Sequence, residues 1–311
     1  VDILLMDALM DAVPEQARLV LVGDADQLPS VGAGRVLGDI LDSEIVRTVR
    51  LTEVYRQAKE SLIIMNAHSI NRGEYPRINE KDRDFFMIGR NSELSICETI
   101  LSLCGKRLPG YYADLDPIRD IQVLTPVKKS MIGTIHLNEN LQKLLNPPLP
   151  GRAELKTAGR TLRVGDKVMQ IRNNYEREWQ SAGLEKDGAG VFNGDIGFIS
   201  DIDTEDGLIT VLYDETKYVQ YEISDLDEIE LAYAMTIHKS QGSEFPCVIL
   251  SLDSPNRKLY YRNLLYTAVT RAKQLLLIMG NSRAVPAMVE NNRKTLRYTN
   301  LAGFLSEQTQ A

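Results

Sequence analysis

Four apolar runs, each about as long as one buried strand, limit what this chain can fold into more than any other feature. They are RLVLVGD at 18–24, IQVLTPV at 121–127, CVILSL at 247–252 and QLLLIMG at 274–280. Runs without polar alternation are typical of parallel strands that are buried on both faces. Segments with helical spacing lie between them, at 35–43, 57–73, 92–108, 134–145 and 263–273. Parallel strands joined by helical crossovers predict an α/β domain.

The pattern changes between about 149 and 230. Strand candidates there are short and separated by turn pairs such as Gly165-Asp166, Asn193-Gly194 and Asp206-Gly207, with no segment of helix length between them. Such spacing is typical of hairpins in a small antiparallel barrel. We expect an inserted, SH3-like β-barrel, with the polar stretch 176–190 as one of its loops. The α/β pattern resumes at 231.

The charge of the chain is unevenly distributed. The formal net charge is −7, from 36 Lys and Arg against 43 Asp and Glu. Eleven acidic residues and one lysine fall within 198–230, a formal −10, so the rest of the chain carries +3. Overall acidity therefore does not exclude a nucleic-acid partner for the surface outside the barrel.

Several functional classes receive no support. The three cysteines, and His68, His136 and His238, show no metal-ligand spacing, and no apolar run is long enough to cross a membrane. We expect no metal ligands, no membrane partner and a reducing, cytoplasmic setting. The chain starts at Val1 within an amphipathic helix at 1–14 that has no evident cap. That start predicts that the sequence is part of a longer protein.

Four polar segments carry candidate chemistry. They are GDADQLP at 23–29, LTEVYRQ at 51–57, MTIHKSQGSEF at 235–245 and YTAVTRAK at 266–273. Gln27 can hold a water or a phosphate oxygen, although its segment also reads as a plain turn. Arg56 beside Tyr55 suits a phosphate and a stacked base, or a surface salt bridge. Arg271 suits a developing phosphate charge, or a helix dipole.

The order and separation of these segments, with LTPVKKSMIGTIHLNENLQ at 124–142, resemble the later motifs of superfamily 1 helicases. The resemblance is greatest to the exodeoxyribonuclease V alpha-subunit family, the RecD-type DNA helicases of repair and recombination. It implies ATP binding and hydrolysis, Mg²⁺, and translocation on single-stranded DNA in the 5′→3′ direction. By resemblance, the catalytic residues are Gln27, Arg56 and Arg271.

The same resemblance assigns binding residues. Nucleotide contacts fall on Gln27, Tyr55, Arg56, Gly242, Glu244 and Arg271, and DNA contacts on Thr125, Lys128, Thr236 and His238. Because the barrel is acidic, we expect any DNA contact it makes to come from its flanks, at Lys167, Arg172 or Asn193. Its acidic face then steers DNA by exclusion or contacts a protein.

One departure from the family is large. The sequence contains no G-x-x-x-x-G-K-[ST] phosphate loop, and it lacks the Asp-Glu pair that the family places just before a segment like 1–3. We expect both, with the Mg²⁺ ligands, upstream of Val1, and we expect this chain alone to be inactive. The predicted organisation is the end of motor domain 1A at 1–48, the RecA-like motor domain 2A at 49–148 and 231–311, and the inserted barrel at 149–230.

Expected partners are single-stranded DNA, the upstream part of motor domain 1A and other subunits of a helicase–nuclease complex. Two alternatives stay open. One is a non-enzymatic protein-interaction module that keeps the helicase fold and works through its acidic barrel. The other is the helicase domain of a conjugative relaxase, which shares these motifs.

Overall fold

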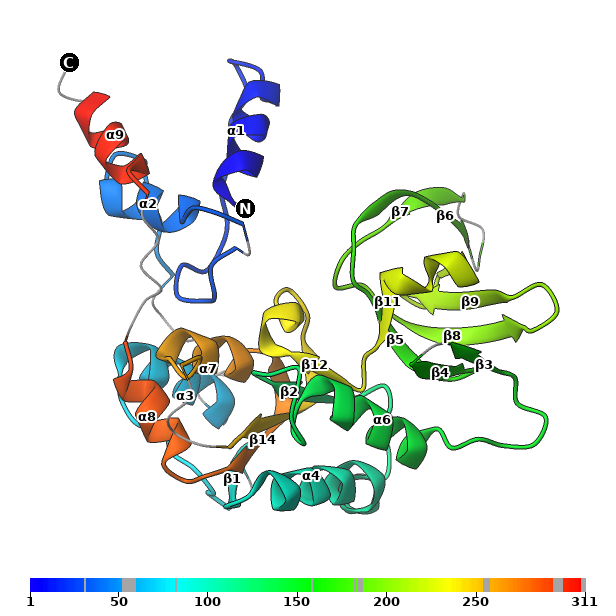
Figure 1. Ribbon diagram of the computed structural model, residues 1–311. Coiled ribbons are helices and arrows are strands. Elements are labelled where there is room, and N and C mark those ends of the chain that lie inside the picture. Colours follow the sequence, from blue (N-terminus) through cyan, green and yellow to red (C-terminus); the bar gives the residue numbers. More distant parts are fainter. Residues whose placement is uncertain are drawn as a thin grey trace.

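A computed structural model shows a parallel-sheet domain, an antiparallel barrel beside it and an N-terminal segment above it (Figure 1). The structure describes residues 1–30, 32–51, 60–81, 83–157, 159–181, 183, 187–253, 258–292 and 299–308. Helices and strands below are those of this part of the chain.

The central sheet has five strands in the order β1-β14-β13-β2-β12, and every pairing is parallel. Its strands are β1 (Phe85–Gly89), β2 (Ile121–Thr125), β12 (Ala234–Thr236), β13 (Phe245–Leu252) and β14 (Ala272–Gly280). Strands β2 and β12 are buried throughout, and β13 and β14 almost so. The three apolar runs from 121 onward therefore form the buried parallel strands that the sequence predicts.

Helices cover both faces of this sheet because alternate strand residues point into different cores. Val248 and Leu250 face a core formed with α3 (Leu62–Arg72), α7 (Arg262–Val269) and α8 (Ala284–Glu290). Cys247 and Ile249 face a second core formed with α4 (Glu93–Ser102), the π-helical turn η2 (Leu103–Arg107), α5 (Leu108–Tyr111) and α6 (Thr134–Leu145). The result is a three-layer α/β/α domain, the RecA-like architecture expected.

The barrel comprises β3 (Glu154–Thr157) and β4 (Arg160–Arg163), paired with each other, and a seven-stranded antiparallel sheet in the order β11-β5-β8-β9-β10-β6-β7. Those strands are β5 (Lys167–Gln170), β6 (Asn174–Ser181), β7 (Gly188–Val191), β8 (Ile196–Asp203), β9 (Leu208–Tyr213), β10 (Lys217–Glu222) and β11 (Ile229–Leu231), with the 3₁₀ turn η3 (Ile223–Glu228) before β11. A separate core of mostly aliphatic and tyrosine side chains fills it. The antiparallel insertion is confirmed.

The expectation of a loop at 176–190 was wrong in part. Most of that stretch forms the hairpin strands β6 and β7. Its polarity is misleading because this hairpin has one solvent-facing side, where the exposed Glu176, Glu178 and Gln180 alternate with the partly buried Arg177 and Trp179.

Polar side chains of α6 attach the barrel to the motor domain. Asn138 donates to the carbonyls of Leu231 and Ala234, at 3.0 and 2.9 Å. One and two turns later, Gln142 and Asn146 each donate to the buried carboxylate of Asp166, at 2.6 and 2.7 Å. Both chain connections of the barrel are thus tied to one helix face.

Two expectations about the N-terminal segment were wrong. The helix α1 (Ile3–Ala12) is capped after all, because Asp2 Oδ1 accepts from the N–H of Leu5 at 2.9 Å. The run 18–24 is not a buried strand: Val20 is 78% and Val22 92% exposed. A parallel strand requires a hydrogen-bonded neighbour, and none of the described strands lies beside this run. At the other end of the chain, α9 (Leu301–Gln308) packs on α2 (Val36–Ser43).

Candidate nucleotide and DNA site

Three of the motif segments meet at the backbone of Leu28. Its N–H donates to Thr267 Oγ1 at 3.0 Å, and its carbonyl accepts from Gln241 Nε2 at 2.7 Å. The Leu28 side chain is buried in the core shared by α3 and α7. The segments GDADQLP, TIHKSQG and YTAVTRAK are therefore joined through both backbone polar groups of one residue, Leu28, and through its apolar side chain.

Asp24 organises the loop that carries Gln27. Its Oδ2 accepts from the Tyr266 hydroxyl at 2.8 Å and from Gln27 Nε2 at 3.0 Å. Burial, with the adjacent Asp24 carboxylate, raises the pKa of Tyr266, so the phenol stays protonated and donates. A further contact from α3, Asn71 Nδ2 to Asp26 Oδ2 at 2.7 Å, holds the same loop. Gln27 is partly exposed and is oriented by this network.

Arg271 lies in the turn between α7 and β14, just beyond the helix in which it was expected. It is only 5% exposed. Its Nε donates to the Thr267 carbonyl at 3.1 Å, Nη1 to the Ser243 carbonyl at 2.9 Å and Nη2 to Thr270 Oγ1 at 3.1 Å. Burial lowers the pKa of the guanidinium, but an arginine remains charged in proteins. In this conformation each of its three nitrogens donates a hydrogen bond to a protein oxygen, so the guanidinium is held by the protein.

Gly242 and Glu244 flank the carbonyl that Arg271 binds. Gly242 has φ of +85°, in the left-handed region that favours glycine. Glu244 forms an ion pair with Lys273 at 3.2 Å, and both side chains are more than half exposed. Glu244 is thus open to solvent and held by a residue of the YTAVTRAK segment.

A cavity of about 180 Å³ lies beside Asp24 and Gln27, between the N-terminal segment and the start of α7. Arg35, Tyr261 and Asn263 also line it. Pockets for small molecules are commonly about 300–1,000 Å³, so this cavity is small for a nucleotide.

The described residues do not form a complete Mg²⁺–ATP site. No phosphate loop is present in the sequence, and the residues that the structure places include no group of three His, Cys, Asp or Glu suited to a metal ion. The carboxylate of Asp24 already accepts two side-chain hydrogen bonds. These residues fit one side of a nucleotide site. Tyr55 and Arg56 lie outside the described residues.

Two of the predicted DNA contacts are neighbours in the sheet. Thr125 and Thr236 are register partners at the ends of β2 and β12, and both are buried. Thr125 Oγ1 accepts from the N–H of Val127 and Thr236 Oγ1 from the N–H of Lys239, each at 3.4 Å. Their hydroxyls shape the following turns. His238 is half-buried, and burial lowers the pKa of its imidazole, which favours the neutral form at pH 7.

Lys128 is exposed in the loop after β2, where the next residue, Lys129, is exposed too. The loop closes tightly at Gly133, because a Cβ there would lie 2.5 Å from the Lys128 carbonyl oxygen. Glycine at this point lets the two lysines project from a fixed turn, a suitable arrangement for phosphate contacts.

Of the three barrel-flank residues expected to contact DNA, one expectation was wrong. Lys167 is 1% exposed and therefore unable to contact DNA. The local sequence, which places this lysine directly after a turn, gave no sign of its burial. Arg172 pairs with Asp227 at 2.7 Å, whereas Asn193 is exposed on the turn between β7 and β8.

Sequence reasoning missed the residues that join the segments, namely Asp24, Asn71, Gln241, Tyr266 and Thr267. Four of these, all but Asn71, lie within the quoted motifs, so the motifs pointed to the right place. Their partners lie in remote segments, and no local pattern in the sequence encodes such pairings.

Comparison with known proteins gives matches along most of the chain. Residues 1–88 match an AAA domain, 137–213 the ATP-dependent RecD-like DNA helicase SH3 domain and 231–279 the UvrD-like helicase C-terminal domain. The ATP-dependent RecD2 DNA helicase of Deinococcus radiodurans is 35% identical over 280 residues, which are 90% of this chain and 35% of that protein. The RecBCD enzyme subunit RecD of Mycolicibacterium smegmatis is 29% identical over 310 residues, 97% of this chain and 51% of that protein.

Among solved structures, Pif1 helicase from Bacteroides in complex with ADP-AlF3 and ssDNA matches with a TM-score of 0.47 and 19% identity, over 93% of this chain and 66% of that one. Pif1 helicase from Candida albicans matches with a TM-score of 0.44 and 16% identity, over 85% and 61%.

The parallel sheet and the inserted barrel are those of a RecA-like α/β protein, and the domain matches relate the chain to helicases of the RecD-like and UvrD-like kind. Within that class the chain carries the RecD-type domains, an SH3 barrel of the RecD-like kind followed by the UvrD-like C-terminal domain. The resemblance drawn from the motifs is confirmed. The chain spans between about a third and a half of the length of the two curated relatives described.

Proposed function

We propose that this chain contributes the second motor domain and the inserted barrel of an ATP-dependent DNA helicase that moves 5′→3′ along single-stranded DNA in repair or recombination. In this proposal, 49–148 and 231–311 form motor domain 2A, 149–230 the barrel and 1–48 the end of motor domain 1A. The observation that supports it best is the joining of three motif segments at Leu28.

That junction gives Gln27 a defined position. A glutamine that senses a nucleotide must report to the second motor domain, and here its loop is held by α7 and by the segment after β12. Arg271 lies one turn beyond Thr267, so a movement of Arg271 toward a phosphate changes the same α7 end that holds the loop. Together they would complete the side of the nucleotide that faces 2A.

The proposed partners of the whole protein are single-stranded DNA, the remaining part of motor domain 1A and, by analogy with the RecBCD subunits among its relatives, further subunits of a helicase–nuclease complex. ATP would bind between the motor domains, with Mg²⁺ held by residues that this sequence does not contain. We place the protein in the cytoplasm. In the part of the chain that the structure describes, no helix has the length and apolarity to cross a bilayer.

The DNA part of this proposal is tested by titrating the chain with a fluorescein-labelled 20-nucleotide oligo-dT. We expect weak binding whose affinity falls steeply with salt, since lysine–phosphate contacts release counterions. Lys128→Ala should weaken binding and reduce the salt slope by about 0.7, the value for one phosphate contact on a single strand. Lys143→Ala, an exposed lysine on α6, is the matched control. Tight binding that ignores salt, or equal effects of the two variants, would contradict the proposed DNA surface.

A further inference from the structure

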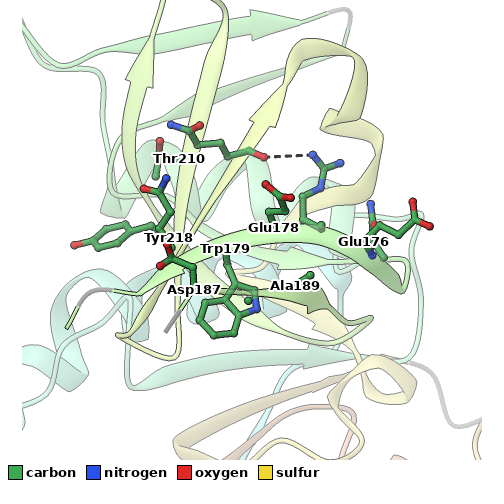
Figure 2. A pocket seen from close by; sticks show the side chains of 12 residues that line it. Glu176, Glu178, Trp179, Asp187, Ala189, Thr210 and Tyr218 are labelled. Carbon is green, nitrogen blue, oxygen red and sulfur yellow. Dashed lines mark hydrogen bonds between the residues drawn. The ribbon is translucent and has the colours of Figure 1, made fainter. Parts of the chain in front are cut away.

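A groove of about 960 Å³ lies on the outer face of the barrel, away from every motif described above. Strands β6, β7, β9 and β10 form it, and the side chains of Glu176, Glu178, Gln180, Asp187, Tyr218 and Gln220 are among its lining. Figure 2 shows Glu176 and Glu178 along β6, with Trp179 on the other side of that strand. The helicase function proposed above makes no use of this groove.

The groove opens because two neighbouring strands separate. β10 pairs with β9 along all of Lys217–Glu222, but it pairs with β6 only from Lys217 to Val219. Beyond Val219 the gap is bridged by Arg177, whose Nη1 donates to the Gln220 carbonyl at 3.3 Å (Figure 2). A groove between diverging strands exposes backbone and alternate side chains together, which suits an extended polypeptide.

The core side of the hairpin fixes this shape. The Trp179 ring lies against Gly188, where a Cβ would come within 2.6 Å of the indole. Arg177 pairs with Asp225 at 2.8 Å and with Glu228 at 3.2 Å, and its guanidinium lies over the Tyr221 ring. Packing and ion pairs of Trp179 and Arg177 therefore hold the strands in place. The side chains of Glu176 and Glu178 point to the other side, where a ligand can contact them.

The groove is negatively charged and offers a flat aromatic surface. Glu176 and Glu178 are exposed, and neither carboxylate takes part in an ion pair or hydrogen bond among the residues that the structure places. Asp187 caps the N–H of Ser181. The lining base, Arg177, is already paired with two carboxylates. A nucleic-acid backbone is repelled by such a lining.

The groove also carries neutral side chains. Tyr218 is 37% exposed, and Gln180 and Gln220 add amide groups.

We propose that this groove binds an extended segment of a protein partner that is rich in lysine or arginine. The free carboxylates of Glu176 and Glu178 would pair with its basic side chains, and Tyr218 would pack against their aliphatic stems. The amides of Gln180 and Gln220 are placed to bond its backbone. This interaction stands independently of the helicase function, because it involves neither the motor motifs nor the DNA-facing loops.

The test uses the whole chain and a synthetic peptide of five Lys-Thr repeats as the probe. Trp179 is the single tryptophan of the chain and borders the groove, so its emission reports binding of a tryptophan-free peptide. The groove variant is Glu176→Gln/Glu178→Gln. The matched control is Glu205→Gln/Asp206→Asn, which removes the same charge from the exposed turn between β8 and β9. Tyr218→Ala tests the aromatic contact without a change of charge.

We expect the groove variant to bind the peptide about tenfold more weakly, since two exposed charge contacts together are worth about 1.4 kcal/mol. Tyr218→Ala should also weaken binding, and the control should bind like the wild type. Equal losses in the groove and control variants would mean that bulk acidity attracts the peptide. Failure of the folded wild type to bind at low salt would overturn the proposal.

Discussion

Two adjacent buried charges, Asp166 and Lys167, lie where the barrel meets the motor domain. Asp166 accepts hydrogen bonds from Gln142, Asn146, the Tyr233 hydroxyl and the N–H of Arg163, at 2.6 to 2.8 Å. Burial nevertheless raises the pKa of its carboxyl, since desolvation outweighs these contacts. The ammonium of Lys167 has fewer polar contacts than the Asp166 carboxylate: its Nζ donates to the Ile121 carbonyl at 3.4 Å and lies 5.5 Å from the centre of the Phe245 ring. The sequence around them reads as an ordinary turn, so neither environment was predictable.

Lys167 makes stability depend on pH in a defined window. Burial lowers the pKa of its ammonium from the ordinary 10.5 to about 8. Between these values the unfolded chain holds more protons than the folded chain, so the lysine's contribution to stability rises with pH. Relative to Lys167→Met, the wild type should gain up to about 3 kcal/mol from pH 8 to 10.5.

The measurement is urea unfolding of the wild type and Lys167→Met at several pH values between 7 and 10.5. Burial also raises the pKa of buried tyrosines and cysteines such as Tyr221 and Cys247, but these groups are common to both proteins and their effects largely cancel in the difference. The exposed Lys143→Met is the control, and its difference from wild type should stay constant. A constant difference for Lys167→Met as well would show that Lys167 is solvated in the folded state.

Arg271 should have a structural role that is separable from any role at a nucleotide. Arg271→Ala leaves the Thr267 and Ser243 carbonyls without this donor, and we expect a loss of about 3 kcal/mol in unfolding free energy. Arg271→Lys should recover only part of it, because one ammonium cannot replace the planar fork. Denaturant unfolding of both, beside the exposed Arg283→Ala, measures the effect. Unchanged stability of Arg271→Ala would leave only a ligand-directed role.

At the scale of elements, sequence patterns predicted the helices and strands whose formation depends on their own residues. The helix at 134–145 was predicted to the residue, and the buried runs from 121 onward became parallel strands. The run 18–24 is also largely apolar but has no strand beside it among the described residues, because a strand depends on neighbours that its own sequence does not contain. The meeting of the motifs at Leu28 is also non-local: it joins the backbone of Leu28 to side chains more than 200 residues away in the sequence.

The polar face of α6 should couple the stability of the barrel to that of the motor domain. Gln142→Leu removes one donor from the buried Asp166 carboxylate and one from the Thr161 carbonyl oxygen. We expect a loss of about 2 kcal/mol, with the barrel unfolding first. Trp179 fluorescence reports the barrel and far-UV circular dichroism the whole chain, so their urea midpoints should separate. Glu139→Leu, on the exposed side of the same helix, should leave them coincident. Coincident midpoints in Gln142→Leu would show that other contacts dominate this junction.

At the scale of the whole molecule, three bodies are joined by different kinds of contact. The barrel is attached through buried amide and carboxylate groups on both of its chain connections. The N-terminal segment is attached through the Leu28 junction and the Asp24–Tyr266 contact, and α9 packs on its helix α2. Many of its apolar side chains, such as Leu4, Val20 and Val22, are largely exposed. An assembly of this kind suits a segment whose position reports on a ligand, with the barrel held fixed to the motor domain.

We expect that the chain by itself does not hydrolyse ATP. Hydrolysis in P-loop motors needs backbone N–H groups and a lysine around the β- and γ-phosphates, and a hydroxyl and an acidic residue that hold Mg²⁺. The sequence contains no such loop, and Arg271 is bound to protein oxygens. Preorganised electrostatics is usually the largest catalytic contribution, so Gln27 and Arg271 alone should give no turnover above background. The measurement is phosphate release by the purified chain with Mg²⁺, ATP and oligo-dT, with Arg271→Ala as the control for a contaminating ATPase. DNA-stimulated release that Arg271→Ala abolishes would refute this expectation and place a complete site within these 311 residues.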